Sequence, residues 1–170
     1  MTIEDALSRA AKALKSEKIT FALIGGFALA AHGVVRATQD IDLLVDGAKK
    51  ELAKSAMVES GFKVNFENEE VMHLSGPGHL YILFANRDST MDMLVRARPL
   101  NDFPVPVVSP EDLIGLKIQA YKNDPGREFQ DKADIQALLE KTANLNFVLI
   151  KKYADIFGEW SFIVELRSKL

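Results

Sequence analysis

Residues 21–45 read FALIGGFALAAHGVVRATQDIDLLV, and this stretch decides the fold. Its short apolar run over 21–24 predicts a buried strand that ends at the strong breaker Gly25-Gly26. Small and helix-favouring residues follow, so we expect a short helix over 27–32, packed closely against that strand. A polar turn then leads into a second strand, whose first residues are acidic where the others are aliphatic.

The second strand, expected over 40–45, carries two carboxylates. Successive side chains on a strand point to opposite faces, so Asp40 and Asp42 share one face. Two such carboxylates on a partly buried strand must take up a proton, pair with cations or bind a metal. Magnesium usually takes one or two protein carboxylates and completes its shell with water and substrate phosphate. The pair by itself leaves two interpretations open, a magnesium site or a solvated strand end.

The composition of the whole chain narrows the class of protein. Its 170 residues fit one domain with a substantial core. The net charge of −3 argues against broad nucleic-acid or anionic-membrane binding, although a local basic pocket remains open. The absence of cysteine excludes disulfides and thiolate catalysis, and the N-terminal residues lack the basic start and apolar core of a signal peptide. We therefore expect a cytoplasmic protein.

The middle of the chain predicts three further strands. Phe62, Val64 and Phe66 alternate with polar residues, which is typical of a strand with one buried face. The segments 70–74 and 79–84 flank a Ser-Gly-Pro-Gly turn and together predict a hairpin.

A third carboxylate, Asp92, lies inside the apolar segment 90–95, which we expect to form a strand. A lone aspartate in such a strand is costly unless its charge is compensated. A salt bridge to a nearby arginine would do this, and so would a metal. A metal shared with Asp40 and Asp42 is the economical explanation of all three carboxylates.

The last third of the chain predicts helices. Ser109-Pro110-Glu111-Asp112 is a clear helix start, and the helix that follows runs to about residue 122. Further helices are expected over 127–141 and, as two short segments, in 146–170. Strands dominate the first two thirds, so the pattern predicts an α/β core with a helical C-terminal part.

The order of these features resembles the fingerprint of the nucleotidyltransferase superfamily. The matching residues are Ile24-Gly25-Gly26, Asp40-Ile41-Asp42 and Met91-Asp92-Met93. The chain looks most like bacterial toxin–antitoxin and abortive-infection nucleotidyltransferases of the AbiEii type. Their SPEDL-x-x-x-K segment and Asp-x-x-Asp helix resemble 109–117 and 131–134.

This resemblance implies an α/β (α+β) nucleotidyltransferase fold, a mixed sheet flanked by helices. The core would span 1–108, and 109–170 would be a helical part of the same domain. It also implies magnesium-dependent transfer of a nucleoside monophosphate from a nucleoside triphosphate to a hydroxyl of RNA, protein or a small molecule. Such a transfer is an in-line displacement at phosphorus, in which metal ions, here two Mg²⁺, offset the developing charge.

The resemblance also assigns roles to the acidic and glycine residues. Asp40 and Asp42 would hold magnesium, and Asp92 would bridge to a second ion or accept the proton of the attacking hydroxyl. Gly25 and Gly26 would leave room for the phosphates, which backbone N–H groups can meet.

Three further residues are candidate phosphate contacts: Arg36, Thr38 and Lys117. Arg36 has an alternative role as the partner of Asp40, and a lysine on a helix is usually only solvated. Ion pairing on the surface explains Lys132, Asp131 and Asp134 better than a site does, and helix periodicity turns these three mostly outward. The three histidines lack metal-ligand spacing and are assigned no metal.

Two other functions remain open at this point. One is a catalytically silent binding module, for example an antitoxin-like partner of a protein encoded nearby. The chain also shares its fold and acids with enzymes that modify aminoglycoside or lincosamide antibiotics.

Overall fold

The computed structural model describes residues 2–100 and 103–170. The chain divides into two compact units. The first comprises Met1–Ala31 and Arg36–Val108, and the second comprises His32–Val35 and Ser109–Leu170.

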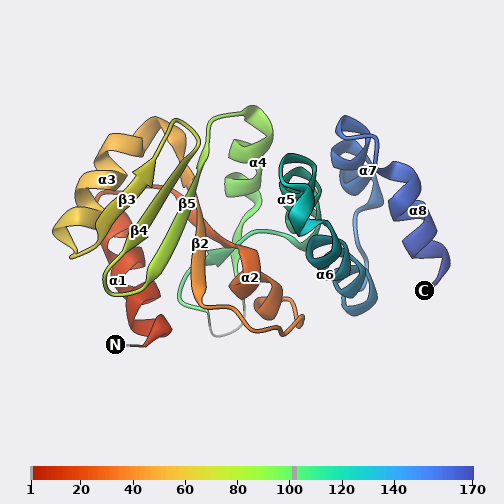
Figure 1. Cartoon of the computed structure of the whole chain (residues 1–170), viewed down its shortest axis with the longest axis horizontal. Coiled ribbons are helices and arrows are strands. Elements are labelled where there is room, and N and C mark those ends of the chain that lie inside the picture. Colours follow the sequence, from red (N-terminus) through yellow and green to blue (C-terminus); the bar gives the residue numbers. More distant parts are fainter. Residues whose placement is uncertain (1, 101–102) are drawn as a thin grey trace. The chain divides into compact units, whose positions relative to one another are not determined.

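The first unit is built on a seven-stranded mixed sheet in the order β3-β4-β5-β2-β1-β7-β6 (Figure 1). β2 pairs in parallel with β5 and antiparallel with β1, which makes the sheet mixed, as expected. The strands are β1 Phe21–Ile24, β2 Asp40–Asp46, β3 Lys63–Glu67, β4 Val71–Ser75, β5 His79–Ala85, β6 Arg98–Pro99 and β7 Pro106–Val107.

Four α-helices accompany this sheet in the described part of the first unit: α1 Ile3–Ser16, α2 Gly25–Ala31, α3 Lys50–Glu59 and α4 Asp88–Arg96. A 3-10 turn, η1 Gly47–Lys49, precedes α3. Figure 1 shows α1 and α3 on one side of strands β3 and β4. The start of α1 is set by a capping box, in which the Thr2 hydroxyl accepts from the Asp5 N–H at 3.1 Å and the Asp5 carboxylate accepts from the Thr2 N–H at 2.8 Å.

Alternation over the first half of β2 separates a core face from an open face, which closes again at buried Leu44. Ile41, Leu43 and Val45 are at most 1 % exposed, whereas Asp40 and Asp42 are half-buried on the opposite face. The shared face predicted for the two aspartates is therefore confirmed.

The prediction that Phe66 is buried with Phe62 and Val64 was wrong. A bulge shifts the β3–β4 register between Val64 and Phe66, and Phe66 is 50 % exposed while Phe62 is 3 % exposed. Because side chains alternate along a strand, one extra residue is enough to turn Phe66 onto the open face.

The prediction of a strand around Asp92 was also wrong, since this segment forms helix α4. Its buried residues are Thr90, Met93 and Leu94, the i, i+3, i+4 spacing of one helix face. The Thr90 side chain also closes the first turn, accepting from the Arg87 N–H at 3.2 Å. A short apolar run is compatible with both structures, and here the helical period prevails and leaves Asp92 exposed.

The second unit is helical, as expected, with α5 Pro110–Asn123, η2 Pro125–Arg127, α6 Glu128–Lys141, α7 Phe147–Ile156 and α8 Trp160–Ser168. Ser109 caps α5 by accepting from the Asp112 N–H at 3.1 Å. Within the described parts of the chain, every helix is too short or too polar to cross a membrane.

Candidate active site

The glycine turn, which is Gly25-Gly26 at the start of α2, and the acidic strand β2 meet at Asp42. This residue lies opposite Ile24 on β1, and Gly25 follows Ile24 directly. Gly25 has φ +66°, and a Cβ added there would lie 2.1 Å from Asp42 Oδ2. Glycine is therefore required at position 25 both by the backbone conformation and by the carboxylate that lies against it.

Thr38 makes a similar contact with the second glycine. A Cβ on Gly26 would lie 2.8 Å from the Thr38 Cβ, and the Thr38 hydroxyl donates to the Asp40 carbonyl at 3.4 Å. The structure thus brings Gly25, Gly26, Thr38 and the two aspartates into one small region. Arg36 precedes this region on the loop before β2, is half-buried, and donates from Nη1 to the Ala37 carbonyl at 3.3 Å.

Strand β5 adds two residues that the sequence analysis missed. In the parallel ladder His79 lies opposite Asp40, and Tyr81 lies opposite Asp42. Residues paired in this way point to the same face of a sheet, so an imidazole and a phenol share the open face with the carboxylates. The alternation of His79 and Tyr81 with buried Leu80 and Ile82 marks an open face, but it does not reveal which strand is the neighbour.

The structure does not unite Asp92 with the other two aspartates in a metal centre. Within residues 2–100 and 103–170, no group of three His, Asp or Glu side chains could hold a metal ion. Asp92 is exposed on α4, so the strand on which its predicted bridging role rested is not there. Asp40 and Asp42 still fit one Mg²⁺, because that ion is commonly held by two carboxylates with water and phosphate.

Lys117 belongs to a buried ion network in the second unit. Its Nζ lies 2.8 Å from Asp131 Oδ1 and 2.7 Å from Asp134 Oδ2, and all three residues are at most 4 % exposed. Arg127 Nε adds a contact of 3.1 Å to Asp131 Oδ2.

The outward orientation predicted for Asp131 and Asp134 was therefore wrong. At three residues apart both lie on one face of α6, where each carboxylate pairs with the Lys117 ammonium. Lys132 fits the prediction of an ion-paired surface residue, since its Nζ lies 2.6 Å from the Glu128 carboxylate.

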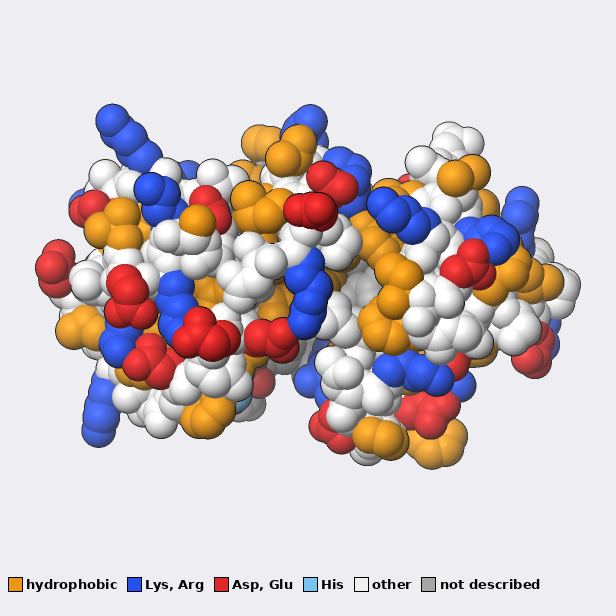
Figure 2. Space-filling model, turned by 90° about the horizontal axis from the view of Figure 1, so that it is seen from above, with side chains coloured by type: hydrophobic (Ala, Val, Ile, Leu, Met, Phe, Trp, Pro, Cys, Tyr) orange, Lys and Arg blue, Asp and Glu red, His pale blue; other side chains and the backbone are white. Residues whose placement is uncertain are grey.

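The surface charges follow the weakly acidic composition. Figure 2 shows Lys and Arg side chains interspersed with Asp and Glu over the face in view, with hydrophobic side chains between them. On that face neither sign of charge forms a continuous patch, unlike the basic stripe of a nucleic-acid-binding surface.

Comparison with known proteins gives likeness in structure but not in sequence. No protein-family model and no curated protein sequence matches the chain. Among solved structures, ANT(2″)-Ia in complex with adenylyl-2″-tobramycin is similar with a TM-score of 0.68 at 16 % identity, over 92 % of this chain and 99 % of that chain.

Two other solved structures are similar over most of their length. The lincosamide antibiotic adenylyltransferase LnuA, with lincomycin bound, has a TM-score of 0.62 at 19 % identity, over 83 % of this chain and 99 % of its own. An antigenic nucleotidyltransferase-like protein from Paracoccidioides brasiliensis has a TM-score of 0.56 at 20 % identity, over 97 % and 91 % of the two chains. The mixed sheet, the acidic strand β2 and these likenesses together show that the chain has the nucleotidyltransferase fold.

Proposed function

We propose that this protein is a magnesium-dependent nucleotidyltransferase that transfers a nucleoside monophosphate from a nucleoside triphosphate to a hydroxyl acceptor. The observation that carries the proposal is the contact between the Asp42 carboxylate and the Gly25 backbone, with Asp40 on the same face. It sets a pair of carboxylates suited to magnesium directly against the glycine turn.

In this proposal each residue of the region has a physical task. Asp40 and Asp42 would hold one Mg²⁺, which neutralises phosphate charge when it is bound. Gly25 and Gly26 would let the Asp42 carboxylate and the Thr38 side chain pack directly against the turn, since these side chains fill the space that a Cβ would take, and Thr38 would thereby hold the loop before β2 against Gly26. Arg36 is the nearest arginine in sequence to the aspartates, and its guanidinium would contact a phosphate oxygen.

Of the possible acceptor classes, a small molecule is the first to test. The similar structures include an enzyme solved with adenylylated tobramycin and an adenylyltransferase solved with lincomycin. RNA and protein acceptors belong in the same assay, and a role in a toxin–antitoxin system, with a partner encoded nearby, remains a prediction.

A catalytically silent binding module is the second candidate. It is favoured by one observation: in the described part of the chain, no third carboxylate joins Asp40 and Asp42. A protein of this kind would bind a nucleotide at the glycine turn and transfer nothing.

Transfer of label separates the two candidates. The protein would be incubated with each of the four α-labelled nucleoside triphosphates, Mg²⁺ and an acceptor panel of tobramycin, lincomycin, total RNA and cell protein. We expect label transfer that EDTA abolishes and that Asp42→Asn reduces by more than about 100-fold, because a metal ligand is lost.

The matched control is Asp92→Asn, which removes the same charge from an exposed position on α4. It should leave the rate within about twofold of the unmodified protein, because in this proposal Asp92 holds no metal ion. Undiminished transfer by Asp42→Asn would refute the assignment of the site. Nucleotide binding without transfer to any acceptor would favour the silent module.

A further inference from the structure

Three rings form a row across the open face of the sheet and end beside Asp42. The ring centroids of Phe66 and His73 lie 5.3 Å apart, and those of His73 and Tyr81 lie 4.5 Å apart with an edge-on tilt of 62°. These residues come from β3, β4 and β5, and their register continues to Asp42 on β2. We call Phe66, His73 and Tyr81 the aromatic row.

The aromatic row is accessible to a ligand. Phe66 is 50 % exposed and Tyr81 is 36 % exposed, values that are high for large rings on a sheet. The β3 bulge is what turns Phe66 toward the other two rings instead of into the core.

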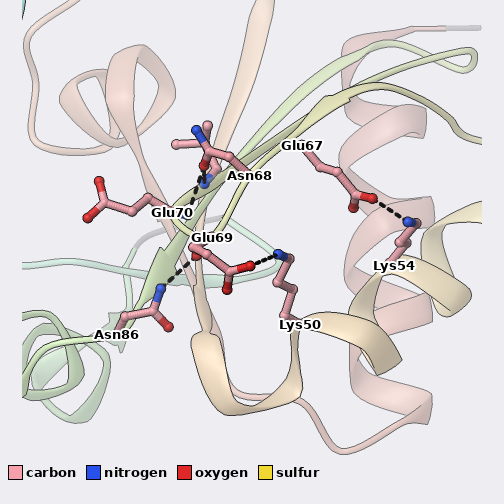
Figure 3. Close-up of polar contacts among 8 residues, drawn as sticks. Lys50, Lys54, Glu67, Asn68, Glu69, Glu70 and Asn86 are labelled. Carbon is pink, nitrogen blue, oxygen red and sulfur yellow. Dashed lines mark hydrogen bonds and ion pairs between the residues drawn. The ribbon is translucent and has the colours of Figure 1, made fainter.

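The hairpin that carries Phe66 and His73 is tied to its surroundings (Figure 3). The Asn68 side chain closes the β3–β4 turn by accepting from the N–H groups of Glu70 and Val71, both at 2.8 Å. Further contacts link the hairpin to α3 and to the end of β5, through the pairs Lys54–Glu67, Lys50–Glu69 and Asn86–Glu69. A surface held in this way pays little ordering entropy when a ligand binds.

The position of the row relative to Asp42 matches the side from which an acceptor would come. This step rests on the proposed function, in which the phosphates lie at Gly25 and Gly26, directly after the last residue of β1. In an in-line displacement the attacking and leaving oxygens lie on opposite sides of phosphorus. β5 lies on the other side of β2 from β1, so the attacking hydroxyl would arrive over Tyr81.

Charge distinguishes between classes of acceptor. Strands β2, β4 and β5, which are described throughout, contain no Lys or Arg, β3 adds Lys63 opposite Ser75, and β2 brings two carboxylates to the open face. The carboxylates outnumber this one lysine on the four strands, so the face is poor in the cations that a polyanionic nucleic acid requires. Aromatic rings beside carboxylates instead favour an uncharged or cationic ring compound, by stacking and by cation–π attraction.

We propose that the aromatic row is the acceptor-binding site of this protein, and that it binds a small, uncharged or cationic ring compound that carries hydroxyl groups. Tyr81 lies next to the reacting hydroxyl, and Phe66 binds the far end of the molecule. The row spans two strand spacings, about 10 Å, which suits two or three linked rings.

Direct binding without nucleotide tests the proposal independently of catalysis. Tobramycin and lincomycin serve as ring probes, and an oligoadenylate ten nucleotides long serves as a polyanion, each titrated by calorimetry. We expect at least one ring probe to bind and the oligonucleotide not to bind. Phe66→Ala should weaken ring binding about three- to tenfold, and Phe66→Tyr, which keeps the ring, should change it less than twofold.

Phe129→Ala is the control, because it removes an aromatic ring that is 93 % exposed on α6. It should leave the Kd unchanged. The proposal is overturned if neither ring probe binds, if Phe66→Ala binds as tightly as the unmodified protein, or if the oligonucleotide binds and Phe66→Ala weakens it.

Failure of this inference can be told from failure of the proposed function. If ring binding depends on Phe66 but no label is transferred, the acceptor-binding site is supported and the nucleotidyltransferase activity is rejected. If label is transferred and the acceptor KM is unchanged in Phe66→Ala, the activity is supported and the acceptor-binding site is rejected.

Discussion

Replacing Gly25 by alanine tests whether the glycine turn is built around Asp42. The new Cβ would meet Asp42 Oδ2 at 2.1 Å, Cγ at 2.6 Å and Cβ at 2.7 Å. Carbon atoms in contact prefer about 3.5–4.0 Å, so either β2 or the turn must move. Rotating the carboxylate does not solve the problem, because the Asp42 Cβ is itself too close.

The cost has two parts, which the structure separates. A left-handed backbone with a side chain costs about 1–2 kcal/mol, and overpacking a close contact costs about 1–3 kcal/mol. We expect Gly25→Ala to lower the free energy of unfolding by about 2–5 kcal/mol. Gly61→Ala, in the same unit, has φ +91° with its nearest neighbour, Arg9 Nη1, at an ordinary 3.6 Å, and should show the backbone cost only.

Urea denaturation followed by circular dichroism measures both variants and a double-mutant cycle. Asp42→Gly removes all three clashing atoms, so Gly25→Ala in that background should cost about 1–2 kcal/mol, the backbone part alone. An equal cost of Gly25→Ala in both backgrounds, or a cost no larger than that of Gly61→Ala, would refute the reasoning.

Two further predictions concern the second unit, and the fluorescence of its one tryptophan, Trp160, reports both. Lys117→Met removes the ammonium that two buried carboxylates share and should destabilise this unit by about 3–5 kcal/mol. Normal stability with weakened nucleotide binding would instead restore a phosphate contact for Lys117. Burial raises the pKa of Glu159, but hydrogen bonds from Lys122 and Tyr121 lower it more, so its pKa lies below the usual 4.5. A carboxylate whose pKa is lowered on folding contributes stability above pH 4.5, and this stability is lost as the pH falls through the pKa of the folded state. The urea concentration at the unfolding midpoint should therefore fall as the pH is lowered below 4.5. It should fall less in Glu159→Gln. Equal acid sensitivity of the two proteins would show that Glu159 is not the group responsible.

Periodicity and capping made several elements predictable. The apolar run of β1, its glycine stop and the alternation of β2 are local patterns, and each reports its own structure. The starts of α1 and α5 follow in the same way from Thr2 and Ser109, whose side chains accept from backbone N–H groups only a few residues ahead.

Local patterns failed where two structures fit the same short segment. The run around Asp92 has no strict alternation, and α4 forms because Thr90, Met93 and Leu94 can be buried together. Asp131 and Asp134 were misplaced for a related reason, since a charged residue on a helix is usually solvated unless a partner such as Lys117 arrives from another helix.

The sequence by itself determined that two aspartates share a face of a strand behind a glycine turn, because alternation and chain breaks are properties of consecutive residues. Only the tertiary structure decided what surrounds them. It placed Tyr81 beside Asp42, lined up His73 and Phe66 behind it, and put Asp92 on helix α4 instead of a strand. Strand neighbours and their register depend on pairings between residues far apart in the chain, and the pattern within one strand does not specify them.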